Sequence, residues 1–533
     1  MDSTTVAPHH RQSPTEALAR RTDEWLNVHG KLCLAAALAL CLLTFSGYSH
    51  AKTIWVDEVL QMMIAGQPTA GQVANQLRDG YIQVDPPMLH EVQHFLLQWF
   101  GQTVQVARLP AIAGFGLMCV SLALLVSRHA PRIYGAAAFF VPYATVLRSR
   151  AMDARPYGVL AGFTALTFLC WDRATQGAAN RKRWLIGFTL SAAVMFCSHF
   201  YSVLFLLPIA MGEAAKLIRR RRFDRGIPVC LGIALIPFVF ALPTAISSSK
   251  KFMQHYFYRA AFSNLYDFYG FAAATLPFAA TLVFLLLAYG AVGGFRREDK
   301  NGAVNDRSLP VFAAAAGFLL IPGAGYFAGA LVTGFFVPYY HMMSVIGLAV
   351  GVPLIVSAMT GRNRLAGLCV LAAMGGHGLF VTARGLTDFR RHDPSYPALA
   401  EISALTHDPD PDIVVASPTL FLPWQYTTRD QTGAKLIYLY DPAKALAALG
   451  TDTADLLYSY LPRITHARIE PFEPWVASHH RFYIASAGPT KGTQEWQYDY
   501  LLKQMHARLL WMGKAGDFDI FQVSPELETE PAH

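Results

Sequence analysis

Apolar stretches alternate with short polar segments along residues 31–382. Many of these stretches run for roughly 17 to 25 residues, the length that an α-helix needs to cross about 30 Å of hydrocarbon. Prolines inside several stretches predict kinks rather than breaks. The alternation predicts an all-α polytopic membrane domain over residues 31–383, with about eleven transmembrane helices at about 31–49, 105–126, 133–148, 157–171, 184–198, 201–218, 226–246, 271–294, 308–333, 335–358 and 365–382.

The pattern changes after Arg384, where short β-type runs alternate with helical runs. Such alternation is typical of a small α/β domain, here residues 384–533. No glycine-rich phosphate loop is present in it, so capping the membrane domain is a simple role for this part. We expect strands at 412–416, 435–439, 481–485 and 518–523, and helices at 420–427, 442–449, 453–460 and 495–510.

The composition agrees with a membrane protein. Hydrophobic residues make up 53% of the chain and charged residues only 15%, with a net charge of +8. Residues 1–383 hold 31 Lys and Arg against 17 Asp and Glu, whereas residues 384–533 hold 13 against 19. A basic excess confined to the membrane part indicates topology and contact with anionic lipids, so no nucleic-acid partner is expected.

The positions of Lys and Arg predict the orientation of the chain. With residues 1–30 as a cytoplasmic tail, the strongly basic loops all fall on the cytoplasmic side. An odd number of spans then places the loop 50–104 and the α/β domain outside. About 30 polar residues precede the first span and no small-residue cleavage site follows it, so we expect an uncleaved anchor.

The cysteines provide no structural framework. All seven lie within predicted spans, and none lies in an outer loop where an oxidising compartment would pair them. Their spacing suits no structural zinc site either.

The outer loop 50–104 is too long for a simple connection. Asp57 and Glu58 directly follow the first span, where carboxylates beside a medium of low dielectric constant are costly unless they bind or react with something. An amphipathic run at 59–77 predicts a helix lying in the membrane interface. The double proline that follows Asp85 fixes a rigid extended turn that aims this carboxylate at the same site.

Further polar and aromatic residues fall on the same predicted face. Arg148, Arg150 and Arg155 lie there against the positive-inside tendency, and the planar guanidinium group matches phosphate oxygens two at a time. The other candidates on this face are Asp153, Tyr157, His199, Tyr201, Lys250, Lys251, Arg259, Tyr339, Tyr340 and His341.

These pieces in this order resemble the GT-C superfamily of polytopic glycosyltransferases, which use polyprenyl-phosphate sugars. The likeness is strongest to the branch of the lipid A aminoarabinose transferases, the protein O-mannosyltransferases and the lipopolysaccharide-core galacturonosyltransferases. The likeness in sequence motifs covers about residues 30–220. The rest of the chain is similar only in its overall architecture. The residues that carry it are Asp57-Glu58, Asp85-Pro86-Pro87-Met88, Arg108-Leu109-Pro110-Ala111, the stretch from Arg150 to Tyr157, and Ser198-His199-Phe200.

The resemblance implies a glycosyltransferase of the cell envelope, a hexosyl- or pentosyltransferase that acts with inversion. Its donor would be a polyprenyl-phosphate sugar and its acceptor a lipid, glycan or protein, on the periplasmic face of a bacterial inner membrane. Asp57 would be the general base, while Glu58 would orient the acceptor or assist. Asp85 would position sugar hydroxyls or help to hold a divalent cation, which some members of the superfamily use; no other cofactor is implied.

The resemblance also implies which residues would hold the leaving phosphate. Arg150 and Arg155 would clamp it, with His199 and Tyr157 as hydrogen-bond donors. The α/β domain would cap this site or help to bind the acceptor.

The chain departs from the family pattern at three places. Asp153 stands where glutamate is usual, and Asp85 replaces a His or Lys before the double proline. A late outer Arg-Tyr pair is replaced by 339–341, so the donor phosphate would need another cation, for which Lys250, Lys251 and Arg259 are the candidates.

Structural alternatives exist for the charged candidates. Asp57 and Glu58 also suit the first turn of a helix, because acids favour helix N-termini. Asp153 also suits an ion pair with Arg150 or Arg155 that joins two loops.

The aromatic and histidine candidates have alternatives too. His199 fits a satisfied interfacial histidine, and Tyr339 and Tyr340 fit an aromatic belt. His90 and His94 have the spacing of metal ligands on a helix, but a packed face explains them better because no third ligand is evident.

A transporter or flippase for a lipid or amphiphile is the alternative function. The same charged residues would then line a translocation path. Transporters usually place such groups near the bilayer midplane and contain internal repeats. Here the charges lie at the outer interface and no repeat is detectable, which favours the enzyme.

Overall fold

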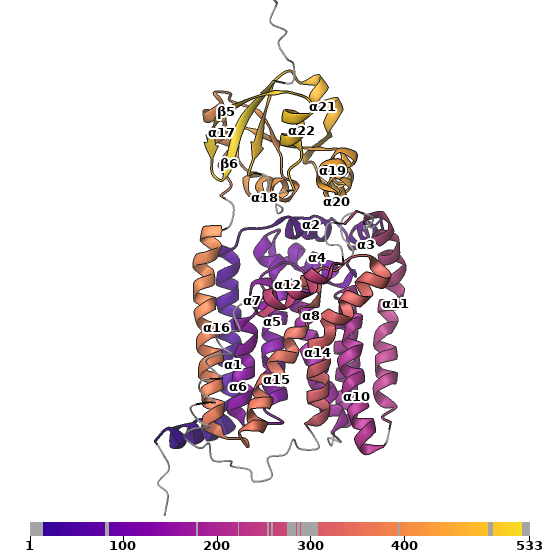
Figure 1. Cartoon of the computed structure of the whole chain (residues 1–533), viewed down its shortest axis with the longest axis vertical. Helices are drawn as coiled ribbons and strands as arrows, with labels where there is room; N and C mark the ends of the chain where they lie inside the picture. The colour runs from indigo at the N-terminus through magenta and orange to yellow at the C-terminus, as the bar shows by residue number, and fades with distance from the viewer. Residues whose placement is uncertain are drawn as a thin grey trace, which may run out of the picture.

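The computed structural model describes residues 14–79, 85–176, 180–221, 223–252, 255–256, 260–273, 284, 288, 308–392, 395–488 and 494–524. A helical bundle makes up the larger part, and a sheet domain stands above one end of it (Figure 1). The two parts are joined in sequence through α16 (Arg364–His392), which runs along the side of the bundle towards the sheet domain.

The helices of the bundle follow the predicted spans closely. Besides α16 they are α1 (Pro14–Ala51), α2 (Val56–Ala65), α3 (Ala70–Asp79), α4 (Met88–Phe100), α5 (Val104–Val126), α6 (Arg132–Phe140), η1 (Val141–Ala144), α7 (Leu147–Arg150), α8 (Tyr157–Thr175), α9 (Arg181–Phe196), η2 (Phe200–Phe205), α10 (Leu206–Arg220), α11 (Gly226–Phe252), α12 (Phe262–Ala273), α14 (Leu309–Ala328), η3 (Gly329–Thr333), η4 (Pro338–His341) and α15 (Ser344–Met359).

Six of the described helical segments are long and apolar enough to cross a membrane by length and composition, and α15 is a shorter apolar helix. Helices cover each predicted span except 271–294, which lies almost wholly outside the described residues. The span predicted at 133–148 is divided into α6, η1 and α7, with Pro142 in the 3₁₀ turn η1. The predicted fold class, a helical membrane domain followed by an α/β domain, is confirmed.

The outer loop forms a layer of short helices over one end of the bundle. Helices α2 and α3 lie at this end, facing the sheet domain, with α4 beneath them (Figure 1). The amphipathic run at 59–77 is therefore two helices rather than one, because α2 ends at Ala65 with Gly66 as its C-cap residue, and Pro68 follows. The second proline of the pair predicted as an extended turn, Pro87, instead adopts helical dihedral angles and caps the start of α4.

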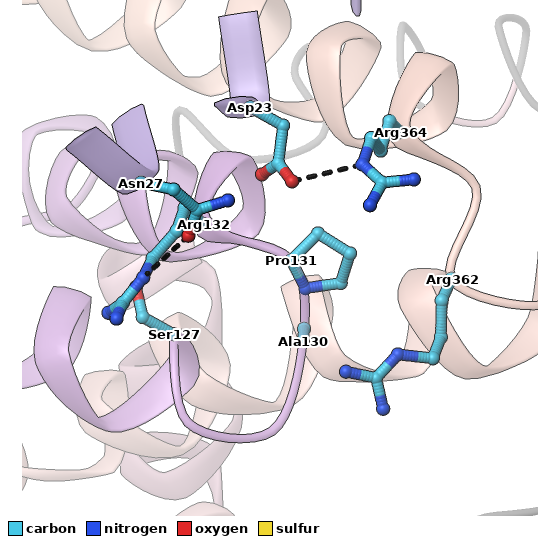
Figure 2. Close-up of a pocket in the computed structure, with 8 residues that line it drawn as sticks. All are labelled: Asp23, Asn27, Ser127, Ala130, Pro131, Arg132, Arg362 and Arg364. Carbon is cyan, nitrogen blue, oxygen red and sulfur yellow. Dashed lines mark hydrogen bonds and ion pairs between the residues drawn. The ribbon is translucent and has the colours of Figure 1, made fainter. Parts of the chain in front are cut away.

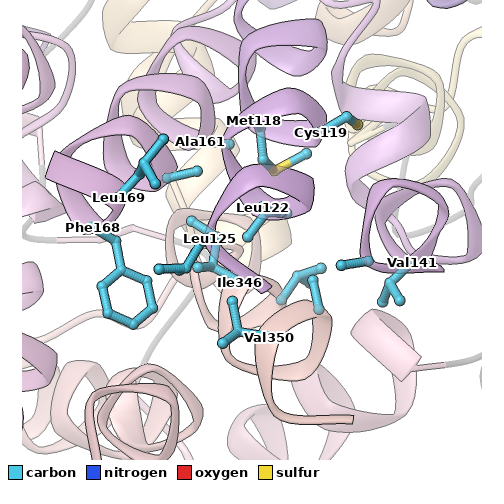
Figure 3. Close-up of a cluster of buried hydrophobic side chains, with 14 of the residues drawn as sticks. Met118, Cys119, Leu122, Leu125, Val141, Ala161, Phe168, Leu169, Ile346 and Val350 are labelled. Carbon is cyan, nitrogen blue, oxygen red and sulfur yellow. The ribbon is translucent and has the colours of Figure 1, made fainter. Parts of the chain in front are cut away.

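The bundle core is apolar and lies where α5, α8, α6 and α15 meet (Figure 3). Helices α5 and α8 pack closely because small residues face each other. A Cβ atom added to Gly158 would lie closer than 3.0 Å to the backbone of Ala111, and one on Gly114 or Gly162 would meet the facing helix as closely. Small residues at such a crossing let two helix backbones approach directly, which is the usual way that membrane helices associate. Side chains labelled in this core include Met118, Cys119, Leu122, Leu125, Val141, Ala161, Phe168, Leu169, Ile346 and Val350.

The sheet domain has six strands in the order β3-β2-β1-β4-β6-β5. Strands β1 to β4 pair in parallel, whereas β6 pairs antiparallel with both β4 and β5. Its elements are α17 (Leu399–Thr406), β1 (Asp412–Val415), α18 (Pro418–Thr428), β2 (Lys435–Tyr440), α19 (Pro442–Leu449), α20 (Thr453–Tyr460), η5 (Leu461–Arg463), β3 (Arg468–Pro471), α21 (Phe472–Ser478), β4 (Phe482–Ser486), α22 (Gln497–Lys503), β5 (Arg508–Ala515) and β6 (Phe518–Ser524).

The long helix predicted at 495–510 is wrong. Helix α22 ends at Lys503, and the residues from Arg508 onwards form β5, which pairs along β6. The local pattern is helical, but the main chain of β5 forms its hydrogen bonds with β6. This strand pairing overrides the local helical preference. Strand β3 was not predicted at all, since it has only four residues and none of the alternation of a longer strand.

The sheet domain rests on α2. Val59 and Leu60 of α2 belong to the same buried apolar cluster as Phe421 and Leu422 of α18. A second contact joins the domain to the outer loop before α12, where His255 Nδ1 lies 3.0 Å from Asp452 Oδ2. The sheet domain therefore holds down the helix that carries Asp57.

Replacing Gly158 by Ala should destabilise the bundle by about 1–3 kcal/mol, because the added methyl group forces the α5 and α8 backbones apart. Thermal unfolding of the purified protein in detergent measures the effect. Gly232→Ala is the matched control, since a Cβ at Gly232 would meet nothing within 4 Å. Equal melting temperatures for the two variants would contradict the close approach.

Candidate active site

Glu58 forms a fully buried ion pair with Arg108 of α5. Arg108 Nε donates to Glu58 Oε1 at 2.8 Å and Arg108 Nη2 donates to Oε2 at 2.6 Å, so the contact is bidentate. Glu58 Oε1 also accepts the backbone N–H of Ala154 at 2.6 Å. One carboxylate thus ties α2 to α5 and to the link before α8.

The same arginine closes the end of α1. Arg108 Nη1 donates to the carbonyl oxygens of Ser49 at 2.6 Å and Lys52 at 3.0 Å, and Nη2 donates to that of Thr53 at 3.2 Å. Carbonyl groups at a helix C-terminus lack partners within the helix, and a guanidinium group satisfies several of them together. These contacts position α2. The predicted role of Glu58, to orient the acceptor or to assist, stays a prediction.

Asp57 points to a different environment. Successive residues on a helix project about 100° apart, so Asp57 and Glu58 face different neighbours although they are adjacent. The Asp57 carboxylate is half-buried and faces the charges of Arg155 and Arg150 as well as those of Asp85 and Asp153. Burial raises the pKa of Asp57 above its ordinary value, and the two arginines oppose that rise in part.

Both acids lie in the first turn of α2, as the structural alternative expected. Trp55 occupies the N-cap position without a side-chain cap bond. The helix dipole favours an anionic Asp57 at this end, so the position suits a carboxylate that must ionise.

Arg155 connects three elements around Asp57. Its Nη2 atom lies 3.1 Å from Asp85 Oδ2, and both side chains are nearly buried. Its Nη1 atom donates to Gln61 Oε1 at 3.3 Å. Gln61 in turn donates to Gln93 of α4 at 2.6 Å, so the arginine is held by a buried polar chain.

Arg150 lies between two aromatic rings. Its guanidinium carbon is 5.3 Å from the centroid of Trp55 and 5.1 Å from that of Tyr339. Its Nη1 atom donates to Asp153 Oδ2 at 3.0 Å, and Lys52 Nζ pairs with the other carboxylate oxygen. The structural alternative for Asp153, an ion pair that joins two loops, is therefore realised with Arg150 and Lys52 rather than with Arg155.

Aromatic side chains from separate elements line the same region. The ring of Tyr157 lies 5.6 Å from that of Tyr339, and the ring of His199 lies 4.6 Å from that of Tyr340. The ring centroids of Tyr201 and Tyr340 are 5.2 Å apart. Tyr339 and Tyr340 thus pack inside the protein against the site, in addition to any role in an aromatic belt.

The two histidines differ in their bonding. His199 Nδ1 accepts the backbone N–H of Tyr201 at 3.1 Å, so a neutral ring carries its proton on Nε2. Burial lowers the pKa of His199 to about 4, which keeps it neutral near pH 7. His341 is fully buried, stacks on Phe336 at 4.4 Å and pairs its Nδ1 with the carbonyl oxygen of Val337. Its Nε2 atom has no hydrogen-bond partner among the described residues, so the predicted contact of His341 with a substrate stays a prediction.

Several buried donors of the site have no hydrogen-bond partner among the residues that the structure describes. They are the indole Nε1 of Trp55, the Nε of Arg155 and the hydroxyl of Tyr157. Buried polar atoms are seldom left unsatisfied in native proteins, so three donors around one acidic group indicate a place for an acceptor-rich ligand such as a phosphate.

A metal ion does not fit the described side chains well. Within the described ranges no group of three or more His, Cys, Asp or Glu residues has the geometry to hold one. Arg155 also lies against Asp85, which the sequence had suggested as a ligand.

Three predicted residues stay untested by the geometry. Arg259 lies outside the described residues, and of Lys250 and Lys251 only the backbone within α11 is described. Sequence reasoning missed Lys52 and Gln61 as members of this network. Lys52 lies in the non-helical link between α1 and α2, and a lone lysine or glutamine in an outer segment carries no pattern that indicates its partners.

Comparisons with known proteins agree with this architecture. A family model described as dolichyl-phosphate-mannose-protein mannosyltransferase matches residues 84–246, which is less than half of the chain. No curated protein sequence matches the chain significantly.

Two solved structures have a similar fold. The structure of ArnT from Cupriavidus metallidurans bound to undecaprenyl phosphate is 13% identical, with a TM-score of 0.57 over 95% of this chain and 100% of that one. The apo structure of the same protein is 12% identical, with a TM-score of 0.51 over 92% of this chain and 98% of that one. At this identity the likeness establishes the fold. The chain therefore shares the fold of that structure, as the resemblance predicted, and is a multi-pass integral membrane protein.

Glu58→Gln should destabilise the protein by about 3–5 kcal/mol, because it leaves the Arg108 guanidinium buried without a counter-charge. Thermal unfolding in detergent measures the loss. Glu473→Gln is the control, since Glu473 is an exposed partner of Lys444 and a surface pair contributes little. A melting temperature equal to that of the control would mean that the buried pair is not the anchor of α2.

Proposed function

We propose that the chain is a glycosyltransferase that moves a sugar from a polyprenyl-phosphate donor to a nucleophilic group of an acceptor. Asp57 is the general base in this proposal, and Arg155 with Arg150 holds the phosphate of the donor. The family model and the fold similarity support the class of reaction, and the ArnT structure bound to undecaprenyl phosphate supports the class of donor.

One observation carries the proposal. A half-buried carboxylate faces two arginines at one end of the bundle, beside buried donors that have no partner among the described residues. A base for the acceptor and cations for the leaving group are the two requirements of sugar transfer from a phosphate. A buried setting strengthens both effects, since charges interact more strongly away from water.

The reaction is a single displacement. The acceptor hydroxyl gives its proton to Asp57 Oδ as its oxygen attacks the anomeric carbon. The bond between that carbon and the phosphate oxygen breaks, and its electron pair stays on the polyprenyl phosphate. Arg155 and the Tyr157 hydroxyl stabilise this oxygen, and attack from the face opposite the leaving group inverts the anomeric carbon.

The remaining candidates have supporting roles in this proposal. Asp85 keeps Arg155 aligned and contacts sugar hydroxyls. His199 donates through Nε2, and Tyr201, Tyr339 and Tyr340 form the apolar wall on which the sugar or the isoprenoid chain rests. The acceptor is a lipid, glycan or protein, and the sheet domain over α2 borders its path of approach.

The proposed orientation follows from the positions of basic residues. Arg132, Arg362 and Arg364 lie at the end of the bundle away from Asp57, as the positive-inside tendency requires for a cytoplasmic end. The site then faces the periplasm of a bacterial inner membrane.

Asp57→Asn should reduce sugar transfer by about 10²- to 10⁴-fold, the usual contribution of a general base. Transfer from a panel of polyprenyl-phosphate sugars, with the purified protein in detergent, measures the loss. The same panel should still raise the melting temperature of this variant, because phosphate binding depends on the arginines and ligand binding stabilises the folded state.

Glu91→Gln serves as the control carboxylate in the same loop and should keep its activity. Unchanged transfer in Asp57→Asn would remove the base from the proposal. Lipid transport by the reconstituted protein that persists in Asp57→Asn, without sugar transfer by either form, would favour the transporter.

The acid limb of the pH profile tests the electrostatic environment of Asp57. Activity requires the ionised carboxylate, so kcat/KM should fall as pH decreases through its pKa, which lies above the ordinary value of 3.8. Arg155→Gln removes an attraction and should move this limb to higher pH. Asp85→Asn removes a repulsion and should move it to lower pH.

Both substitutions break the same ion pair and both should lower the maximal rate, so the opposite direction of the two shifts is the informative result. Shifts in the same direction would show that Asp57 is not the titrating group.

A further inference from the structure

A polar cavity lies at the end of the bundle away from Asp57. Its volume is about 500 Å³. It opens where α1, the turn between α5 and α6, and the turn between α15 and α16 meet, and arginines from two of these elements border it (Figure 2). The lining residues are Asp23, Asn27, Ser127, Ala130, Pro131, Arg132, Arg362 and Arg364.

Among the described residues that line the cavity, Asp23 is the only one with a carboxylate, and this carboxylate is already engaged. Asp23 Oδ2 accepts from Arg364 Nε at 3.0 Å, and its Oδ1 accepts the backbone N–H of Ile133 at 3.0 Å. Arg132 Nε donates to the neutral amide of Asn27 at 3.3 Å. Three guanidinium groups therefore stand against one negative charge, and the cavity has a positive excess.

Arg362 is the least compensated of these cations. Within the described part of the chain it forms no ion pair, and its side chain extends from the turn after α15 towards Ala130 and Pro131 (Figure 2). Its backbone has a φ of +63°, in the left-handed region that non-glycine residues seldom use. This conformation closes the C-terminus of α15, because the N–H of Arg362 donates to the carbonyl oxygen of Ser357 at 2.7 Å, and it sets the point from which the guanidinium group extends.

The neighbouring part of α1 places the cavity at the depth of lipid headgroups. Leu18, Trp25 and Val28 are 57%, 55% and 77% exposed on the helix that also carries Asp23 and Asn27. An exposed tryptophan among exposed aliphatic residues is typical of the membrane–water interface. The arginines of the cavity thus lie beside the headgroup layer rather than in open solvent.

We propose that this cavity binds the phosphate group of an anionic phospholipid from the leaflet on its own side of the membrane, with Arg362 and Arg132 as the main contacts. Guanidinium groups match phosphate oxygens in a bidentate way, and basic pockets between membrane helices at this depth suit anionic headgroups. In the orientation proposed above, this is the cytoplasmic leaflet. The site joins α1, α6 and α16, so an occupied site holds these three helices together.

The test uses the purified full-length protein in a neutral detergent. Short-chain phosphatidylglycerol should raise the melting temperature in a saturable manner, whereas short-chain phosphatidylcholine at the same concentration should not. Arg362→Gln should weaken the apparent affinity for phosphatidylglycerol about fivefold, and Arg132→Gln combined with it should weaken it further. Arg362 has no ion pair with any described residue, so the single variant is expected to fold.

Lys182→Gln is the matched control. Lys182 is an exposed cation at the start of α9, on the same side of the bundle but outside the cavity. Equal weakening by Lys182→Gln, or an unchanged affinity in the Arg362 variants, would overturn the site, because either result means that only the general surface charge attracts the lipid. Inorganic phosphate distinguishes the source of the anion: no stabilisation by millimolar phosphate supports the lipid, and full stabilisation overturns the lipid in favour of a soluble phosphate.

Discussion

The buried pair between Glu58 and Arg108 is the constraint on which the rest of the outer end depends. Removing two charges from water costs several kcal/mol unless each finds close partners, and here the guanidinium group also satisfies the carbonyl groups at the end of α1. The carboxylate binds the N–H of Ala154 at the same time. The end of α1, the start of α2, α5 and the link before α8 are thereby fixed around one point. The site that follows inherits its geometry from this pair, although the pair itself contacts no substrate in our proposal.

Helix geometry explains how two adjacent acids acquire different roles. Glu58 is directed into the bundle, where both of its carboxylate oxygens already accept hydrogen bonds. Asp57 instead faces the cluster around Arg155. Burial makes the Asp57 carboxylate harder to ionise and the neighbouring arginines make it easier, and such a balance is what a base that works near neutral pH needs. The close packing of α5 and α8 at Gly158 then fixes Arg155, because this arginine lies just before α8 begins.

The two ends of the bundle use arginine for different purposes. At the outer end Arg150 and Arg155 are surrounded by carboxylates and aromatic rings, so their charge is directed towards a small buried region. At the opposite end Arg362 and its neighbours border an open cavity beside an interfacial helix. Enclosure favours chemistry on a bound phosphate, whereas an open edge favours reversible contact with lipid headgroups. The polar chain through Gln61 and the sheet domain over α2 both lie at the outer end, where they support the enclosed arginines.

The sequence by itself determined the class of fold. A run of some twenty apolar residues has no stable alternative to a spanning helix, because every backbone polar group must be satisfied within the membrane. It also determined which residues gather at the outer face, since spans of fixed length bring their ends to the same side.

Tertiary structure decided the rest. The division of labour between Asp57 and Glu58 depends on which side of α2 meets α5, and the partners of Asp153 depend on where the end of α1 brings Lys52. The strand at 508–515 depends on a pairing partner that lies elsewhere in the fold. Side-chain direction and strand pairing come from contacts between segments far apart in the chain, and local patterns of polarity carry no record of those contacts.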